Sequence, residues 1–157
     1  MRNALADLLA APWSIRLALL VAVAALAASV ATDVRGRRIP NAVTLPALVA
    51  ILGLSGVAGG WPLVENSLTG AAACAGPFLL AALPGWIGMG DVKLMAVSGA
   101  AAGWPGGVTV LLFVALAGGL QALVQLVWAR VHGEERPRYL PYACAIAAGT
   151  LAAFVVG

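Results

Sequence analysis

Two aspartates, Asp33 and Asp91, are the residues whose type and setting point most directly to chemistry. The sequence has six acidic residues, and the other four lie in the N-terminal tail or in polar connections between apolar runs. Asp33 directly follows one apolar run, in ATDVRGRRIPN, and Asp91 directly follows another, in GMGDVKLMAVSG. A carboxylate beside apolar segments needs an explanation, because it is stable only where it is hydrated, paired or protonated.

A close pair of aspartates can hydrolyse an amide bond. Two adjacent carboxyl groups cannot both ionise cheaply, so they tend to share one proton. The ionised group takes a proton from a water that attacks a carbonyl carbon, and the protonated group donates to the carbonyl oxygen and later to the leaving amine. Gly88 and Gly90 lack a Cβ atom, so a substrate strand could approach their backbone closely. Since water is the nucleophile, we expect no metal and no organic cofactor.

Each aspartate also has a purely structural interpretation. Asp33 could balance the three arginines at positions 35, 37 and 38, and Asp91 could begin a helix, where the helix dipole favours an anion. A separation of 58 positions does not by itself bring the two side chains together. The catalytic interpretation therefore depends on the elements that position them.

The composition is that of an integral membrane protein. The chain has 157 residues, of which 62% are hydrophobic and 10% charged, whereas soluble domains carry about 25% charged residues. The net charge is only +3, and the basic residues lie in short connections, so nucleic-acid binding is excluded. Cys74 and Cys144 lie in apolar runs outside any C-x-x-C pair, so no zinc or redox motif is present. We expect one membrane domain over residues 1–157.

Six apolar segments predict a bundle of about six transmembrane helices, because no backbone can cross lipid with unpaired polar groups. They are Ile15–Ala31, Ala42–Ala58, Ser67–Leu83, Val92–Gly103, Val108–Ala129 and Leu140–Val156. The fourth is short for a full crossing, so we expect it to be tilted or to be extended by the turn around GWPGG. An alternative is that the third and fourth form one interrupted element. Gly99 with Gly103, and Gly56 with Gly60, are G-x-x-x-G pairs that predict close helix contacts.

The basic residues predict the orientation. The first and fifth connections contain six of them and Lys93 lies directly after the third connection, whereas the second and fourth connections contain none. The positive-inside rule places the odd connections in the cytoplasm and both termini outside. An odd number of crossings precedes both Asp33 and Asp91, so both emerge on the cytoplasmic side of the inner membrane.

The flanking motifs resemble those of the prepilin peptidases, or type IV leader peptidases, which are intramembrane aspartic proteases of the GxGD type. DVRGRRIPN at 33–41 and GMGDVKLMAVSG at 88–99 are similar to the family's two signature segments. YLPYACAIAAG at 139–149 resembles its closing segment, with Ala143 where the family has glycine.

The resemblance implies that Asp33 and Asp91 are the catalytic pair and that Gly88 and Gly90 are the glycines of the GxGD motif. Lys93 and Asn41 would be motif neighbours; Lys93 is first interpreted as a residue that snorkels to the interface. The implied substrate is a type IV prepilin or pseudopilin, whose basic leader ends in glycine before an apolar helix. The chain begins almost directly with its first span, without the paired C-x-x-C portion of the methylating members. We therefore expect cleavage without methylation, as in the peptidases of tight-adherence (Flp) pili.

Two alternatives come from other functional classes. A small proton-coupled transporter could use the same aspartates, although transporters place such sites near the bilayer midplane rather than at helix ends. A catalytically silent pilus-assembly factor could retain the fold. The sequence predicts neither the individual substrate nor the oligomeric state.

Overall fold

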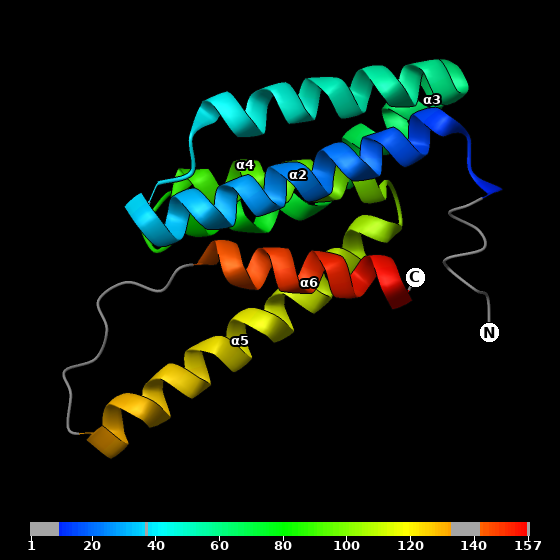
Figure 1. Ribbon diagram of the computed structural model, residues 1–157. Helices are drawn as coiled ribbons and strands as arrows, with labels where there is room; N and C mark the ends of the chain where they lie inside the picture. Colours follow the sequence, from blue (N-terminus) through cyan, green and yellow to red (C-terminus); the bar gives the residue numbers. More distant parts are fainter. Residues whose placement is uncertain (1–9, 37, 133–141, 157) are drawn as a thin grey trace.

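The computed structural model describes residues 10–36, 38–132 and 142–156, and these form five helices (Figure 1). The helices are α2 (Trp13–Gly36), α3 (Asn41–Ala82), α4 (Met89–Ala102), α5 (Gly106–His132) and α6 (Tyr142–Val156). Three of them, α2, α3 and α5, are long and apolar enough to cross a membrane, and α6 is a shorter apolar helix. The prediction of an all-α membrane protein is confirmed, while six crossings and the positions of the termini stay predictions.

Helix α3 reverses direction in its middle. It contains 42 residues, and the backbone leaves the helical conformation at Gly59 and Gly60. Gly60 adopts a left-handed φ of 66°, which glycine tolerates far better than other residues. Beyond the bend the helix runs back beside its first half (Figure 1), and the Ser55 and Ser67 hydroxyls share a hydrogen bond of 2.9 Å. The second and third predicted segments are thus two arms of one hairpin, without the eight-residue connection that the sequence suggested.

The third and fourth predicted segments are separate helices, so the alternative of one interrupted element is wrong. Helix α3 ends at Ala82, and a turn with Gly85 at a φ of 84° leads to α4, which begins at Met89. Helix α4 runs antiparallel to the second arm of α3 (Figure 1).

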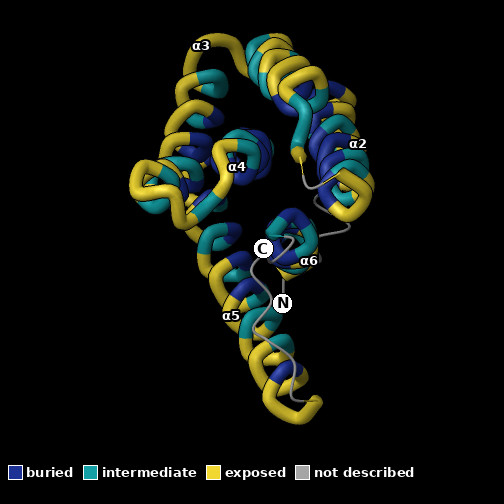
Figure 2. Tube along the Cα trace, turned by 90° about the vertical axis from the view of Figure 1, so that its left-hand side faces the viewer, coloured by how far each residue is buried: buried dark blue, intermediate teal, exposed yellow. Residues whose placement is uncertain are grey.

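Helix α4 is the centre of the bundle. Its 14 residues extend about 21 Å, less than the roughly 30 Å of a hydrocarbon core. Leu94, Met95 and Val97 are fully buried, and Figure 2 shows α4 enclosed by α2, α3 and α6. Because protein rather than lipid covers its sides, α4 can be short. It begins three residues before its predicted start at Val92, which places Asp91 inside the helix rather than before it.

Glycines allow the helices to approach closely around α4. A Cβ atom on Gly99 would overlap the backbone of Gly70 in α3, and one on Gly107 in α5 would lie 2.9 Å from the Gly70 carbonyl oxygen. A Cβ on Gly70 would also lie 2.8 Å from the Cα of Gly103, so the close contact predicted for Gly99 and Gly103 is confirmed. At the other predicted pair, a Cβ on Gly56 would lie 3.4 Å from Val64 on the second arm of the hairpin, an ordinary contact, and Gly60 serves the reversal of α3.

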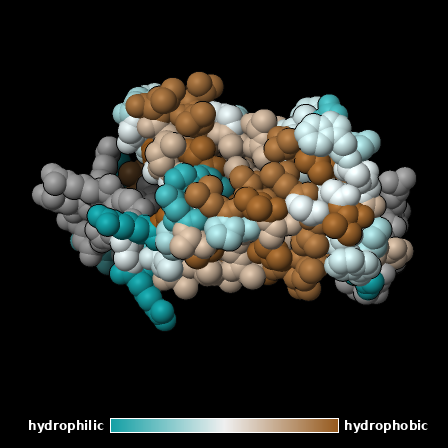
Figure 3. Space-filling view, turned by 90° about the horizontal axis from the view of Figure 1, so that it is seen from above, coloured by the Kyte–Doolittle hydropathy of each residue, from teal (hydrophilic) through white to brown (hydrophobic). Residues whose placement is uncertain are grey.

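Tryptophans and arginines mark the two ends of the bundle. All five tryptophans are more than half exposed, as expected for side chains at membrane interfaces. One end carries Trp13 at the start of α2, Trp61 at the reversal of α3 and Trp104 in the α4–α5 turn. The other end carries Trp86 in the α3–α4 turn and Trp128 near the end of α5. In Figure 3 hydrophobic residues cover the middle of the face, and hydrophilic residues gather toward the end where α2 stops.

Candidate active site

A pocket opens at the end of the bundle where α2 ends and where α3 and α4 begin. Its volume is about 410 Å³. It brings together residues from the end of α2, the connection that follows, and the first turns of α3 and α4. The lining residues are Asp33, Arg38, Ile39, Pro40, Asn41, Gly88, Gly90 and Asp91. Five of the six residues predicted for the site therefore line one pocket, and Lys93 does not.

Asp33 lies in the last turn of α2. The helix continues five residues beyond its predicted end at Ala31, and the Thr32 hydroxyl donates to the carbonyl oxygen of Ala28 at 3.0 Å in this turn. Asp33 is one helical turn from Ser29 and two from Leu26, which are both buried, so it lies on the inward face. Only 2% of Asp33 is exposed. The sequence analysis placed Asp33 after the first span, but Asp33 belongs to that helix and is buried inside the bundle.

Asp91 lies in the first turn of α4, outside the three long apolar spans. Its N–H donates to the carbonyl oxygen of Gly88 at 3.0 Å, and 7% of the residue is exposed. Burial and the negative charge of Asp33 raise the pKa of Asp91 to about 6, against an opposing hydrogen bond with the Gly88 backbone. The carboxyl groups of Asp33 and Asp91 are therefore close enough to interact through space, which the sequence left open.

The two glycines before Asp91 have different reasons to be small. A Cβ atom on Gly90 would lie 2.8 Å from the Cβ of Ile39, so Gly90 is needed to pack α4 against the α2–α3 connection. A Cβ on Gly88 would meet the Asp91 carboxylate at 3.3 Å and otherwise little else. The idea that a missing Cβ leaves space beside the carboxyl group thus applies to Gly88, while Gly90 has a packing role that the sequence did not indicate.

Lys93 and Asn41 contact each other. The Lys93 Nζ donates a hydrogen bond of 2.7 Å to the Asn41 Oδ1, which joins the first turn of α4 to the first residue of α3. Lys93 and Asp91 are two positions apart on α4, so they point to different sides of the helix. Lys93 thus links the two signature segments.

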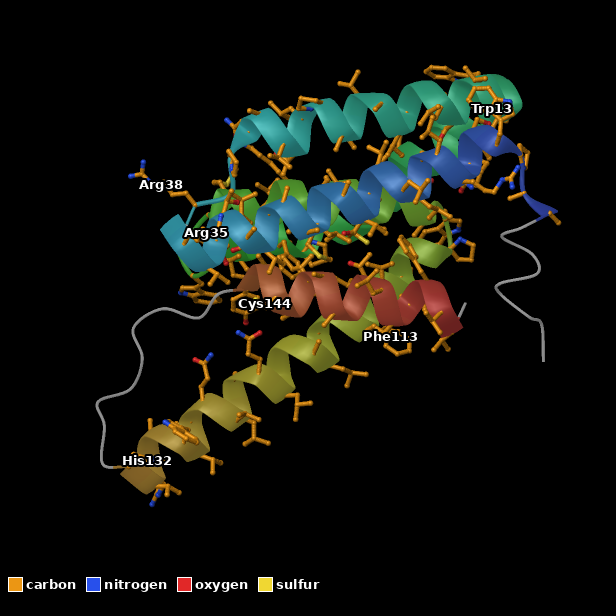
Figure 4. All side chains as sticks on the ribbon, in the orientation of Figure 1. Trp13, Arg35, Arg38, Phe113, His132 and Cys144 are labelled. Atoms are coloured by element: carbon orange, nitrogen blue, oxygen red, sulfur yellow. The ribbon has the colours of Figure 1, made fainter. Side chains whose placement is uncertain are left out.

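Sequence reasoning did not single out Ile39, and it gave Arg38 only a structural role beside Asp33. Ile39 lines the pocket and packs against Gly90. Pro40 has an extended backbone and directly precedes Asn41 at the start of α3. Arg35 and Arg38 lie at the pocket end in Figure 4, opposite Trp13. These residues follow Asp33 closely in the sequence, and this proximity could have predicted that they lie near the pocket.

The described part of the third motif packs helices and is not among the residues that line the pocket. Residues 139–141 lie outside the described residues, and the remainder forms the first half of α6. Ala143 is fully buried, and a Cβ on Gly149 would overlap the backbone of Val114 in α5. Cys144, near the start of α6 in Figure 4, is half-buried. Among the described residues, this motif sets the contact between α5 and α6.

A family comparison adds to this geometry. The sequence model of the type IV leader peptidase family matches residues 20–123, about two thirds of the chain. The chain belongs to the type IV leader peptidase family. The matched range includes every residue that lines the pocket, while the third motif lies outside it. No curated protein and no solved structure gives a significant match. Membership confirms the resemblance seen in the first two motifs and supports a membrane protease of the leader-peptidase type.

Proposed function

We propose that this protein is an intramembrane aspartic endopeptidase whose catalytic residues are Asp33 and Asp91. The observation that carries the proposal is that two buried aspartates on separate helices, 58 positions apart, line the same pocket. In addition, the charge of Asp33 raises the pKa of Asp91, as is expected for two carboxyl groups that share one proton.

The proposed reaction uses one water for each peptide bond. The ionised carboxylate takes a proton from the water as the water oxygen attacks the carbonyl carbon. The protonated carboxyl group donates its proton to the carbonyl oxygen, which gives a neutral tetrahedral intermediate. The intermediate then collapses: the aspartate that took the proton of the water donates it to the nitrogen, the C–N bond breaks, and the other aspartate accepts a hydroxyl proton as the carbonyl forms again. The two aspartates act as one titrating unit, so neither keeps a single role.

The proposed substrate is the leader of a type IV prepilin or pseudopilin, of the tight-adherence (Flp) type. Membership of the family supports a substrate of this class. The pocket lies at the end of the bundle that carries Arg35, Arg38 and Lys93, and the positive-inside rule assigns that end to the cytoplasm. A cytoplasmic leader that precedes an apolar helix would reach the pocket from this side of the inner membrane. Gly88, beside Asp91, is the position where an extended strand could approach.

The test is processing of an Flp prepilin co-expressed with this chain. We expect the wild type to shorten the prepilin and both Asp33→Asn and Asp91→Asn to abolish shortening, because each removes one carboxyl group of the pair. Glu65→Gln is the matched control, since it removes a carboxylate in the other arm of the α3 hairpin, away from the pocket lining. The mass of the new N-terminus tests whether the product is unmethylated.

Two outcomes would overturn the proposal. Full processing by either aspartate variant, at a membrane level equal to wild type, would exclude the pair. Absence of processing by the wild type with any Flp prepilin, together with normal pilus assembly in both variants, would favour a silent assembly factor.

A further inference from the structure

Two buried hydroxyl groups lie one helical turn behind the pocket. Ser29 precedes Asp33 by four residues on α2, and Thr44 follows Asn41 by three residues on α3. Ser29 is 0% exposed and Thr44 is 1% exposed. With a rise of about 1.5 Å per residue, Ser29 lies about 6 Å deeper in the bundle than Asp33, and Thr44 lies about 4.5 Å deeper than Asn41.

Neither hydroxyl has a hydrogen-bond partner among the described residues. Other buried hydroxyls do have partners, since Ser55 bonds with Ser67, and Thr150 donates to Ser98 at 3.1 Å. Buried polar groups without a protein partner usually bind an ordered water. The contrast therefore singles out the region directly behind the two aspartates.

We propose that Ser29 and Thr44 bind an ordered water behind Asp33 and Asp91. The two helices run antiparallel from the pocket (Figure 1), so the hydroxyls lie at a similar depth, and the Asp33 carboxylate above Ser29 is a further acceptor. A buried water commonly has two to four polar partners, and these three groups meet that need.

The role of this water depends on the proposed function. Hydrolysis consumes one water per bond, and the pocket opens at the end of the bundle. A water held by two hydroxyls behind Asp33 lies on the side away from this opening, where it can hydrogen-bond to the Asp33 carboxylate and fix its orientation. Ser29 and Thr44 would then be positioning residues that act through the bound water.

Binding of the water is tested without reference to catalysis. In the full-length protein reconstituted in lipid nanodiscs, with methyl-labelled threonine, we expect a nuclear Overhauser effect between water and the Thr44 methyl group. Thr150 is the matched control, because it is equally buried but donates to Ser98. We expect no water signal at its methyl group. Absence of the signal at Thr44, or equal signals at both threonines, would overturn the water site.

The role of the water is tested with near-isosteric variants. We expect Thr44→Val and Ser29→Ala each to lower kcat about tenfold with little change in KM, and the double variant to resemble the single ones because both remove the same water. Thr150→Val and Ser98→Ala are the controls for loss of a buried hydroxyl. Independent effects in the double variant, or an equal loss of kcat in the controls, would exclude the role. If Asp33 and Asp91 were not catalytic, the methyl–water signal would still be expected, so the two proposals fail separately.

Discussion

At the scale of residues, the site consists of two carboxyl groups in a setting that does not favour two charges. Asp33 and Asp91 are both more than nine-tenths buried, yet they line a pocket that opens at the end of the bundle. Burial and the Asp33 charge both favour the protonated form of Asp91. The pair can therefore keep one proton under conditions in which isolated aspartates would both ionise.

This coupling gives a pH dependence. The pKa of Asp91 is about 6, above its ordinary value of 3.8, so Asp91 is mostly protonated below about pH 6 and mostly ionised above it. We expect the cleavage rate to fall as the pH rises through this pKa, because the pair loses its proton donor. We also expect Asp33→Asn to lower the Asp91 pKa, since it removes the neighbouring negative charge. The measurement is a titration of the infrared band of the protonated carboxyl group.

The control for that titration is Glu65→Gln, which removes a carboxylate outside the pocket and should leave the Asp91 band unchanged. An Asp91 pKa that is the same in Asp33→Asn as in the wild type would contradict the coupling.

At the scale of elements, the site depends on how three helix ends are joined. Helix α2 ends at the pocket, α3 begins five residues later, and α4 begins after the turn that follows α3. The hydrogen bond from Lys93 to Asn41 connects α4 to α3, and the close approach of Ile39 to Gly90 packs the α2–α3 connection against α4. These contacts hold the helix that carries Asp91 at a fixed place relative to the one that carries Asp33.

A double-mutant cycle tests the connection between α3 and α4. Lys93→Met keeps the apolar stem but removes the donors, and Asn41→Ala removes the acceptor. We expect each to lower kcat/KM about fivefold, since an exposed hydrogen bond of this kind contributes about 1 kcal/mol. The double variant should be no worse than either single variant, because all three lack the same bond. Arg35→Met is the control for loss of an exposed cation at this end, and fully additive effects would contradict the connection.

At the scale of the whole molecule, the bundle has two unlike ends. The α2–α3 connection and the α3–α4 turn lie at the pocket end, and the reversal of α3 and the α4–α5 turn lie at the other end (Figure 1). This alternation is what a chain that crosses the membrane repeatedly requires. It agrees with the distribution of basic residues, from which we infer that the pocket end faces the cytoplasm.

Labelling of single cysteines tests this topology. In a background with Cys74 and Cys144 replaced by serine, we expect Arg38→Cys and Trp86→Cys to react with a membrane-impermeant thiol reagent in inside-out vesicles. Trp61→Cys and Trp104→Cys should react only from the opposite side, because they lie at the other end of the bundle. All four side chains are exposed in the wild type, so access to the reagent is not limited by protein. Reaction of Trp86→Cys and Trp104→Cys from the same side would rule out this arrangement.

Much of the fold could be predicted because lipid leaves the backbone few choices. Apolar runs of about twenty residues must form helices, and their bounds were correct to within a few residues for α5 and α6, while the end of α2 was five residues too early. The hairpin of α3 was less predictable. The residues between the predicted segments, such as Trp61 and Leu63, continue the helix, and only the conformation of Gly59 and Gly60 shows where it bends.

The sequence by itself determined the class of protein, the two aspartates, and their common place at one end of the bundle, because hydropathy, charge and the count of crossings depend only on the order of residues. The tertiary structure decided which side chains share the pocket. These helices are apolar on most sides, so periodicity does not show how each is rotated or which face is inward. Rotation follows from packing, such as the contacts of Gly90 with Ile39 and of Lys93 with Asn41. Packing alone therefore turned two separate motifs into one site.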